Sequence, residues 1–134
     1  MILGIDPGSH RIGVAAADLE TRFARPVEVI DGSKTNAIAR IQQLVRELGV
    51  TEVVVGRPTA LSGKSGAAVE SQRELLDRLR AGLDVEVLEY DERLTTVVAD
   101  QGLRRSGASR AARKELRDAV AAQVMLQGYM DSTR

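Results

Sequence analysis

The chain has 134 residues, with 19 basic and 19 acidic side chains, no cysteine and a single histidine. This composition excludes disulfides, thiolate metal sites and a histidine-rich zinc site, and the net charge of zero excludes a uniformly basic coat for nucleic acid. Aromatic residues make up only 2% of the chain, which excludes rows of stacking platforms for single strands.

The first part of the chain predicts three strands. Residues 1–6 form a short apolar run that ends in Asp6, and the turn after it contains Pro7 and Gly8, where glycine can adopt a positive φ. Residues 12–17 resume the apolar run, so the two runs predict an antiparallel hairpin. Residues 24–30 alternate apolar and polar side chains, and the proline among them predicts an edge strand or the start of a strand.

The rest of the chain alternates helices and strands. Apolar spacing predicts strands over 52–56 and 84–90, a loop over 57–66, and helices over 35–48, 67–81, 96–104 and from an N-cap at Ser109 to about 129. The order βββαβαβαα predicts an α/β fold, with a five-stranded mixed sheet and helices on both faces. We expect a single domain over 1–134. No apolar run approaches the roughly 20 residues of a membrane span, so we expect a cytoplasmic protein.

Two predicted strands end in acidic residues. Asp6 closes a buried strand, where a carboxylate is costly unless it is paired or binds a cation; the alternative is a cap on the backbone of the turn. Asp91 and Glu92 close the fifth strand. Adjacent strand residues face opposite sides, so only one of these two shares a side with Asp6, and the residues alone leave the choice open. The alternative to a metal ligand is that one of the two acids caps the next helix while the other pairs with Arg93.

Asp118 is the most informative acid, because it stands at the head of a buried helix. The eight residues that follow are apolar except for one glutamine. Asp118 begins a helical stripe that continues through Ala122, Met125 and Tyr129. Buried acids are rare and surface acids are common, so this position indicates a function. The alternative is an ion pair with Lys114 within the helix.

These acids could converge into one cluster. Three carboxylates within a few ångströms repel one another unless cations bind between them, and their hard oxygen atoms select Mg²⁺ or Mn²⁺. Two such ions about 4 Å apart can stabilise the attacking and the leaving oxygen in phosphodiester hydrolysis. The attacking water is then activated by the ions, so no Ser, Cys or His nucleophile is needed.

Basic residues are concentrated just before Asp118. Residues 104–117 contain six cations and one acid, a net charge of +5 in a chain whose total is zero. Such a cluster can hold a phosphate backbone beside the carboxylates. The alternative is a solvated basic face of a helix.

Four ordered segments resemble the YqgF family, also called RuvX, which comprises Holliday-junction resolvases and pre-16S rRNA nucleases of ribonuclease-H-like fold. They are Gly4-Ile5-Asp6-Pro7-Gly8 with Ile12-Gly13-Val14-Ala15, Val55-Gly56-Arg57-Pro58 with Gly63, Asp91-Glu92-Arg93-Leu94-Thr95-Thr96, and Asp118-Ala119-Val120-Ala121-Ala122. The resemblance covers nearly the whole chain. The family more often has Leu where this chain has Arg57.

The resemblance implies that Asp6, Glu92 and Asp118 are the metal-binding and catalytic acids, which favours Glu92 over Asp91. It implies a nuclease, dependent on Mg²⁺ or Mn²⁺, that processes the 5′ end of pre-16S rRNA. Branched DNA is the competing substrate, and a non-catalytic RNA-binding module is the alternative from another class. For a nuclease we expect phosphate contacts from Arg93, Arg113 and Lys114. Symmetric cleavage of a junction would require a dimer, which must be noncovalent in a chain without cysteine.

Overall fold

The computed structural model describes residues 1–8, 11–32, 36–57, 66–91 and 110–132; of these, the side chains of 57, 66–72, 91 and 110–118 are left undescribed. The strands are β1 (Ile2–Pro7), β2 (Arg11–Ala17), β3 (Ala24–Asp31), β4 (Glu52–Arg57) and β5 (Glu86–Asp91). The helices are α1 (Ala37–Leu48), α2 (Gly66–Gly82) and α4 (Arg110–Ser132). The helix predicted over 96–104 lies outside the described residues, as does most of the loop predicted over 57–66.

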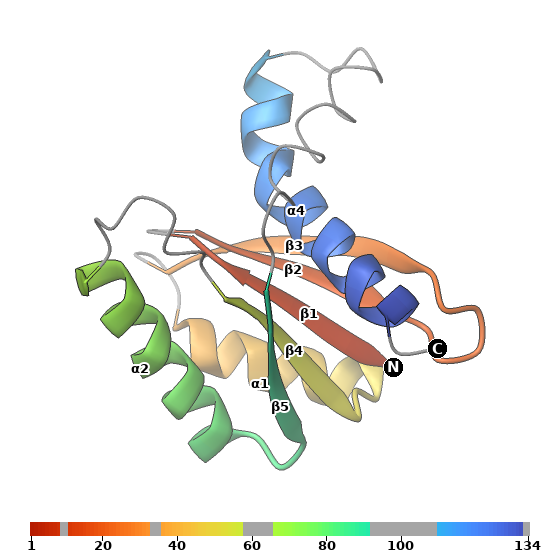
Figure 1. Ribbon diagram of the computed structural model, residues 1–134, viewed down its shortest axis with the longest axis horizontal. Coiled ribbons are helices and arrows are strands. Elements are labelled where there is room, and N and C mark those ends of the chain that lie inside the picture. Colours follow the sequence, from red (N-terminus) through yellow and green to blue (C-terminus); the bar gives the residue numbers. More distant parts are fainter. Residues whose placement is uncertain (9–10, 33–35, 58–65, 92–109, 133–134) are drawn as a thin grey trace.

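The five strands form one mixed sheet in the order β3-β2-β1-β4-β5, so β1 is central (Figure 1). β2 is antiparallel to β1 and to β3, whereas β4 is parallel to β1 and β5 is parallel to β4. β1, β4 and β5 therefore end together, and we call this the carboxyl end of the sheet; the opposite end is the amino end. The predicted hairpin of the first two strands and the predicted mixed sheet are confirmed.

Alternation along the strands gives the sheet two buried faces. One face packs against α1 and α2. Its core contains Leu3, Ile5, Val53 and Val55 from the strands, Ile41 and Leu44 from α1, and Leu76 and Leu79 from α2. The other face packs against α4. Its core contains Ile2, Ala15, Ala17 and Val54 from the strands and Ala122, Met125, Leu126 and Met130 from α4. The predicted arrangement with helices on both faces is thus confirmed, and β4 is buried on both sides as its apolar run predicts.

β3 is an edge strand, as Pro26 predicts. The register between β2 and β3 shifts at Val14 and Ala15, so Pro26 lies beside a β-bulge. A proline has no N–H to donate, and edges and bulges are the places where a sheet tolerates it. On the face of α1, Arg40 donates two hydrogen bonds to the Glu28 carboxylate, at 2.9 and 2.6 Å, and so ties that helix to the edge strand.

The helices begin and end close to the predicted positions. Asn36 caps α1 by accepting the N–H of Ala39 at 3.2 Å, and Gly49 ends it. α4 begins one residue after Ser109 and extends three residues past the predicted end. Within the described residues, none of the helices is both long and apolar enough to pass through a membrane.

Candidate functional site

Asp6 lies at the carboxyl end of the central strand. Its backbone pairs with Gly13 of β2, and its side chain is half-buried. Leu3 and Ile5 belong to the core on the face of α1 and α2, so alternation places Asp6 on the opposite face, the one that α4 covers. The preceding residue, Ile5, is fully buried, so the strand holds this carboxylate on a rigid element.

A tight turn follows Asp6 directly. The Gly8 N–H donates to the Arg11 carbonyl oxygen over 2.7 Å and closes the hairpin between β1 and β2. A Cβ at position 8 would come within 2.6 Å of that same carbonyl oxygen. Glycine is therefore required for space here, and not for the positive φ that the sequence offers as the reason, since Gly8 does not adopt one.

Helix α4 approaches the central strand closely at Gly4. A Cβ at this position would lie 3.0 Å from the Cβ of Leu126, so the absent side chain allows the helix to sit directly on β1. The Arg22 guanidinium, in the turn at the amino end of the sheet, donates to the Met130 carbonyl near the end of α4. α4 therefore runs antiparallel to β1, and its beginning points toward the carboxyl end, where Asp6 lies (Figure 1).

Position 118 belongs to the stripe of α4 that contacts the sheet. Ala122 and Met125, the next members of that stripe, are buried, and Tyr129 packs against the same core. Asp118 lies one helical turn before Ala122, on the side of Asp6. Its backbone is described and its side chain is not, so its contact with Asp6 stays a prediction.

Tyr90 brings the end of β5 to α4. Its ring meets that of Tyr129 edge to face, with centroids 5.8 Å apart and planes at 82°, and a Cβ at Gly128 would lie 3.4 Å from the Tyr90 hydroxyl. Tyr90 therefore faces the side of the sheet on which Asp6 lies. Asp91 ends the strand, and Glu92 and Arg93 lie outside the described residues.

Tyr129 continues this contact to the next strand. Its hydroxyl donates to the Glu52 carboxylate over 2.6 Å, at the amino end of β4. Burial of the phenol, and then the hydrogen bond to Glu52, raise the pKa of Tyr129 to about 12. The two tyrosines thus fill the space between α4 and the β4–β5 edge, a contact that spacing along the sequence does not show.

The predicted phosphate contacts are only partly described. Arg113 and Lys114 belong to the first two turns of α4, whose side chains are outside the description. In Figure 1 the light blue beginning of the helix rises past the ends of the strands. This places the basic part of α4 beyond the carboxyl end of the sheet, the end that Asp6 occupies.

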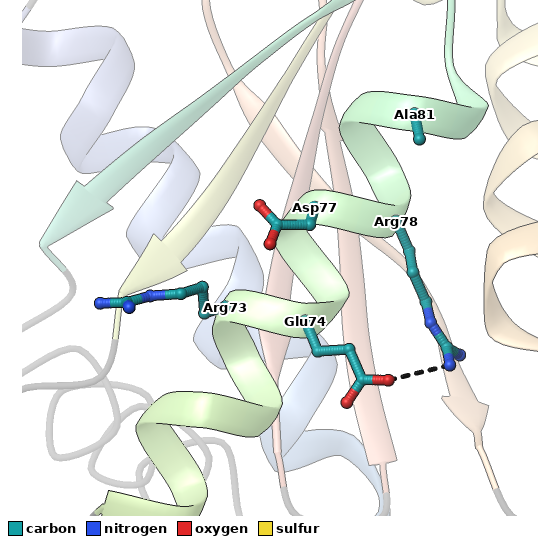
Figure 2. A pocket seen from close by; sticks show the side chains of 5 residues that line it. All are labelled: Arg73, Glu74, Asp77, Arg78 and Ala81. Atoms are coloured by element: carbon teal, nitrogen blue, oxygen red, sulfur yellow. Dashed lines mark hydrogen bonds and ion pairs between the residues drawn. The ribbon is translucent and has the colours of Figure 1, made fainter.

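The described part of the chain contains no group of three or more His, Cys, Asp or Glu side chains that could hold a metal ion. Only Asp6 among the three predicted ligands has a described side chain. A surface depression on α2 is no better candidate, since it is lined along a single helix by charges of both signs and lies on the face opposite to α4. Its residues are Arg73, Glu74, Asp77, Arg78 and Ala81, with an ion pair of 2.9 Å between Glu74 and Arg78 (Figure 2).

Solved structures share this fold. A structure of Thermus thermophilus RuvC in complex with a Holliday junction substrate superposes with a TM-score of 0.64 over 98% of this chain and 94% of that one, at 19% identity. The fowlpox virus resolvase, solved with Holliday junction DNA, gives a TM-score of 0.60 over 98% and 97%, at 12% identity. At these identities the likeness shows the fold alone, which is ribonuclease-H-like, of the α/β class.

Sequence comparison identifies the family. The family RuvX, described as Holliday junction resolvase, matches residues 1–132. A protein of Chloroflexus aggregans named "Putative pre-16S rRNA nuclease" is 45% identical, over 99% of this chain and 94% of its own length. A protein of the same name from Corynebacterium glutamicum is 41% identical, over 97% and 78%. The chain belongs to the RuvX family, as its four motifs predict, and this membership supports a nuclease.

Proposed function

We propose that this chain is a nuclease dependent on Mg²⁺ or Mn²⁺ that processes the 5′ end of pre-16S rRNA. Asp6, Glu92 and Asp118 are the metal ligands and catalytic acids. The name of the curated relatives supports this substrate, and we place the activity in the cytoplasm, carried out by a single domain.

The observation that carries the proposal is the position of Asp6. It lies at the carboxyl end of the central strand, on the face that α4 covers, and the backbone of α4 continues from the buried Ala122 toward this end through position 118. Tyr90, two residues before Glu92, turns to the same face. These positions support a site in which Asp6, Glu92 and Asp118 meet at one end and on one side of the sheet.

The donor chemistry of this set fits hard divalent ions, because carboxylate oxygens are the ligands that Mg²⁺ and Mn²⁺ prefer. Such ions, when bound, activate the attacking water and stabilise the charge that develops on the leaving oxygen. Asp6 supplies a ligand on a strand anchored by fully buried neighbours, so little reorganisation is required of it. In this proposal Glu92, the residue after β5, and Asp118 of α4 complete the set.

Arg93, Arg113 and Lys114 position the substrate. Lys114 lies about one helical turn before Asp118 and Arg113 a little more than one turn before it, beyond the end of the strands (Figure 1). Cations there neutralise the phosphate backbone beside the scissile bond, so binding weakens as salt concentration rises. In this proposal the acidic residues carry out the hydrolysis, and the basic residues bind the substrate.

A second candidate substrate is a four-way DNA junction. The RuvX family carries the description Holliday junction resolvase, and two structures of the same fold are titled as complexes with Holliday junctions. The same carboxylates would serve for either substrate, because hydrolysis of a phosphodiester by bound ions is possible with ribose and with deoxyribose.

The test is a cleavage assay with precursor 16S rRNA and a four-way junction side by side, in Mg²⁺ and in Mn²⁺. We expect the wild type to cut the precursor at its 5′ side, and Asp6→Asn to lower the rate at least about 100-fold. Asp77→Asn, an exposed acid on α2, is the matched control and keeps the wild-type rate.

Equal rates for the wild type and Asp6→Asn would remove this carboxylate from the mechanism. Preferred cleavage of the junction would replace the ribosomal substrate by DNA. Binding of RNA without metal, with neither substrate cut, would favour a non-catalytic RNA-binding module.

A further inference from the structure

Arg11, the first residue of β2, lies at the same end of the sheet as Asp6. Because β2 runs antiparallel to β1, its first residue is placed at the carboxyl end. Asp6 pairs with Gly13, and Arg11 stands two residues further toward that end. The Gly8 N–H donates to the Arg11 carbonyl oxygen over 2.7 Å, so the hairpin fixes the backbone from which this side chain projects.

The Arg11 side chain shares a face of the sheet with Asp6. Ile12 and Val14 of β2 belong to the core under α1 and α2, as does Ile5 of β1. Neighbouring strand residues point to opposite faces, so Arg11 and Asp6 both lie on the face of α4. They are diagonal neighbours on adjacent antiparallel strands, a relation that sets Cβ atoms about 7–8 Å apart and within reach of a long side chain. An arginine at this position can bind an anion held beside Asp6.

Arg11 also has an acidic neighbour on its other side. Asp31, the last residue of β3, lies directly opposite Arg11 in the register between β2 and β3. Arg11 therefore stands between the strands that carry Asp6 and Asp31. Within the part of the chain that the structure describes, it forms an ion pair with neither of them. Arg11 is also partly exposed, so its guanidinium is available to a ligand.

We propose that Arg11 binds a phosphate of the nucleic-acid substrate beside Asp6. This role rests on the proposed function, which puts the scissile phosphate next to that carboxylate. A guanidinium can donate two parallel hydrogen bonds to the oxygen atoms of one phosphate. Its charge also offsets the repulsion between the phosphate and the carboxylates of Asp6 and Asp31. Arg11 thus supplies a cation from the sheet, in addition to those that α4 carries.

Binding without cleavage tests this contact. The full chain is titrated in EDTA into a labelled RNA that spans the 5′ side of pre-16S rRNA and, separately, into a labelled four-way DNA junction. We expect Arg11→Gln to weaken binding about tenfold, because a charged hydrogen-bond donor to phosphate is lost. The slope of log affinity against log salt concentration should fall by about one. A change with one probe alone identifies which nucleic acid Arg11 contacts.

Two further variants serve as controls for this measurement. Arg11→Lys keeps the charge and therefore the salt slope, and it loses only part of the affinity because an ammonium does not bind phosphate in the same two-pronged way. Arg46→Gln removes an exposed arginine from α1, on the other face of the sheet, and should bind as the wild type does.

Steady-state cleavage in Mg²⁺ separates binding from chemistry. Arg11→Gln should raise KM with little change in kcat, whereas Asp6→Asn lowers kcat. An arginine that only relieved the repulsion between Asp6 and Asp31 would act differently. Its loss would lower the free energy of unfolding, measured in urea, and would leave the salt slope of binding at the wild-type value.

The outcomes keep the role of Arg11 apart from the nuclease activity. If Arg11→Gln binds both probes with the affinity and the salt slope of the wild type, the role is overturned even where the wild type cuts RNA. If this variant loses affinity and slope while the wild type cuts neither probe, the nuclease is removed and Arg11 remains a contact for nucleic acid. A wild type that binds neither probe overturns the role as well.

Discussion

The two halves of helix α4 differ in what they contact. From Ala119 onward the helix is fastened to the sheet, through Leu126 on Gly4, the tyrosine pair and the amides that reach the turn before β3. Before Ala119 it carries four basic residues together with Glu115 and Asp118, and in Figure 1 this part extends beyond the sheet. The second half stabilises the fold, and under the proposed function the first half binds the substrate.

The largest expected effect is a loss of cleavage activity from a substitution in the first half of α4. Asp118→Asn lowers metal-supported cleavage about 1,000-fold under the proposed mechanism, because one ligand of the metal cluster is lost. The free energy of unfolding stays the same or rises slightly, since repulsion between carboxylates is relieved. Rates measured under single-turnover conditions, together with urea unfolding, check both outcomes.

Asp131→Asn is the matched control for this change, an exposed acid near the other end of the same helix. It should leave the cleavage rate unchanged. A loss of activity as large as that of Asp118→Asn would show that both halves of α4 serve catalysis.

The next effect concerns packing in the second half. Leu126→Ala removes a fully buried side chain that lies against Gly4 in the core under α4, and we expect a loss of about 3 kcal/mol in the free energy of unfolding. Urea denaturation measures this loss. Leu19→Ala, an exposed position, should change it by no more than about 0.5 kcal/mol.

A smaller effect is expected from the amide of Gln127. This side chain accepts the Ala24 N–H and donates to the Arg22 carbonyl, each over 2.9 Å and partly buried. Gln127→Ala leaves both backbone groups without these partners and should cost about 2 kcal/mol in urea unfolding. Gln43→Ala, an exposed glutamine on α1, should cost far less, and equal losses would contradict the role of the contact.

The smallest effect is a dependence on pH. Tyr129→Phe removes the hydrogen bond to Glu52, with a loss of about 1 kcal/mol at neutral pH. The pKa of Tyr129 is raised to about 12 in the folded protein, against about 10 in an unfolded chain. The unfolded state therefore loses its proton first, so this stabilisation is complete below pH 10 and is lost as the pH rises toward 12.

The comparison of wild type and Tyr129→Phe isolates this titration from that of the other groups. Their free energies of unfolding should approach each other between pH 10 and 12. A difference that stays constant across this range would show that the phenol does not carry the shift.

Local patterns in the sequence predict most of the fold. Alternation in residues 24–30 and Pro26 predict an edge strand, and the valines of β4 predict a strand buried on both sides, because each pattern reflects only neighbours along the chain. The contacts of Gln127 and Tyr129 could not be predicted. Gln127 lies 105 residues from Arg22, and Tyr129 lies 77 residues from Glu52 and 39 from Tyr90, and no spacing rule reaches that far.

The candidate site divides in the same way. Strand alternation is enough to place Asp6 on the face of α4. Helical spacing aligns position 118 with the buried Ala122 and Met125, and the contact of its side chain stays a prediction. The choice between Asp91 and Glu92 is beyond such patterns, since alternation does not hold past the end of a strand. Tyr90, whose ring meets that of Tyr129, turns toward α4, and the choice of Glu92 stays a prediction.

The two glutamines of α4 also act on the outermost strand. Gln127 accepts the N–H of Ala24, and Gln123 donates to its carbonyl oxygen over 3.0 Å. The first residue of β3 thus has both backbone groups occupied by side chains of a helix, and Pro26 two positions later has no N–H at all. An unprotected border strand is a template for fibril growth, and at this corner the molecule blocks the addition of a foreign strand before it can begin.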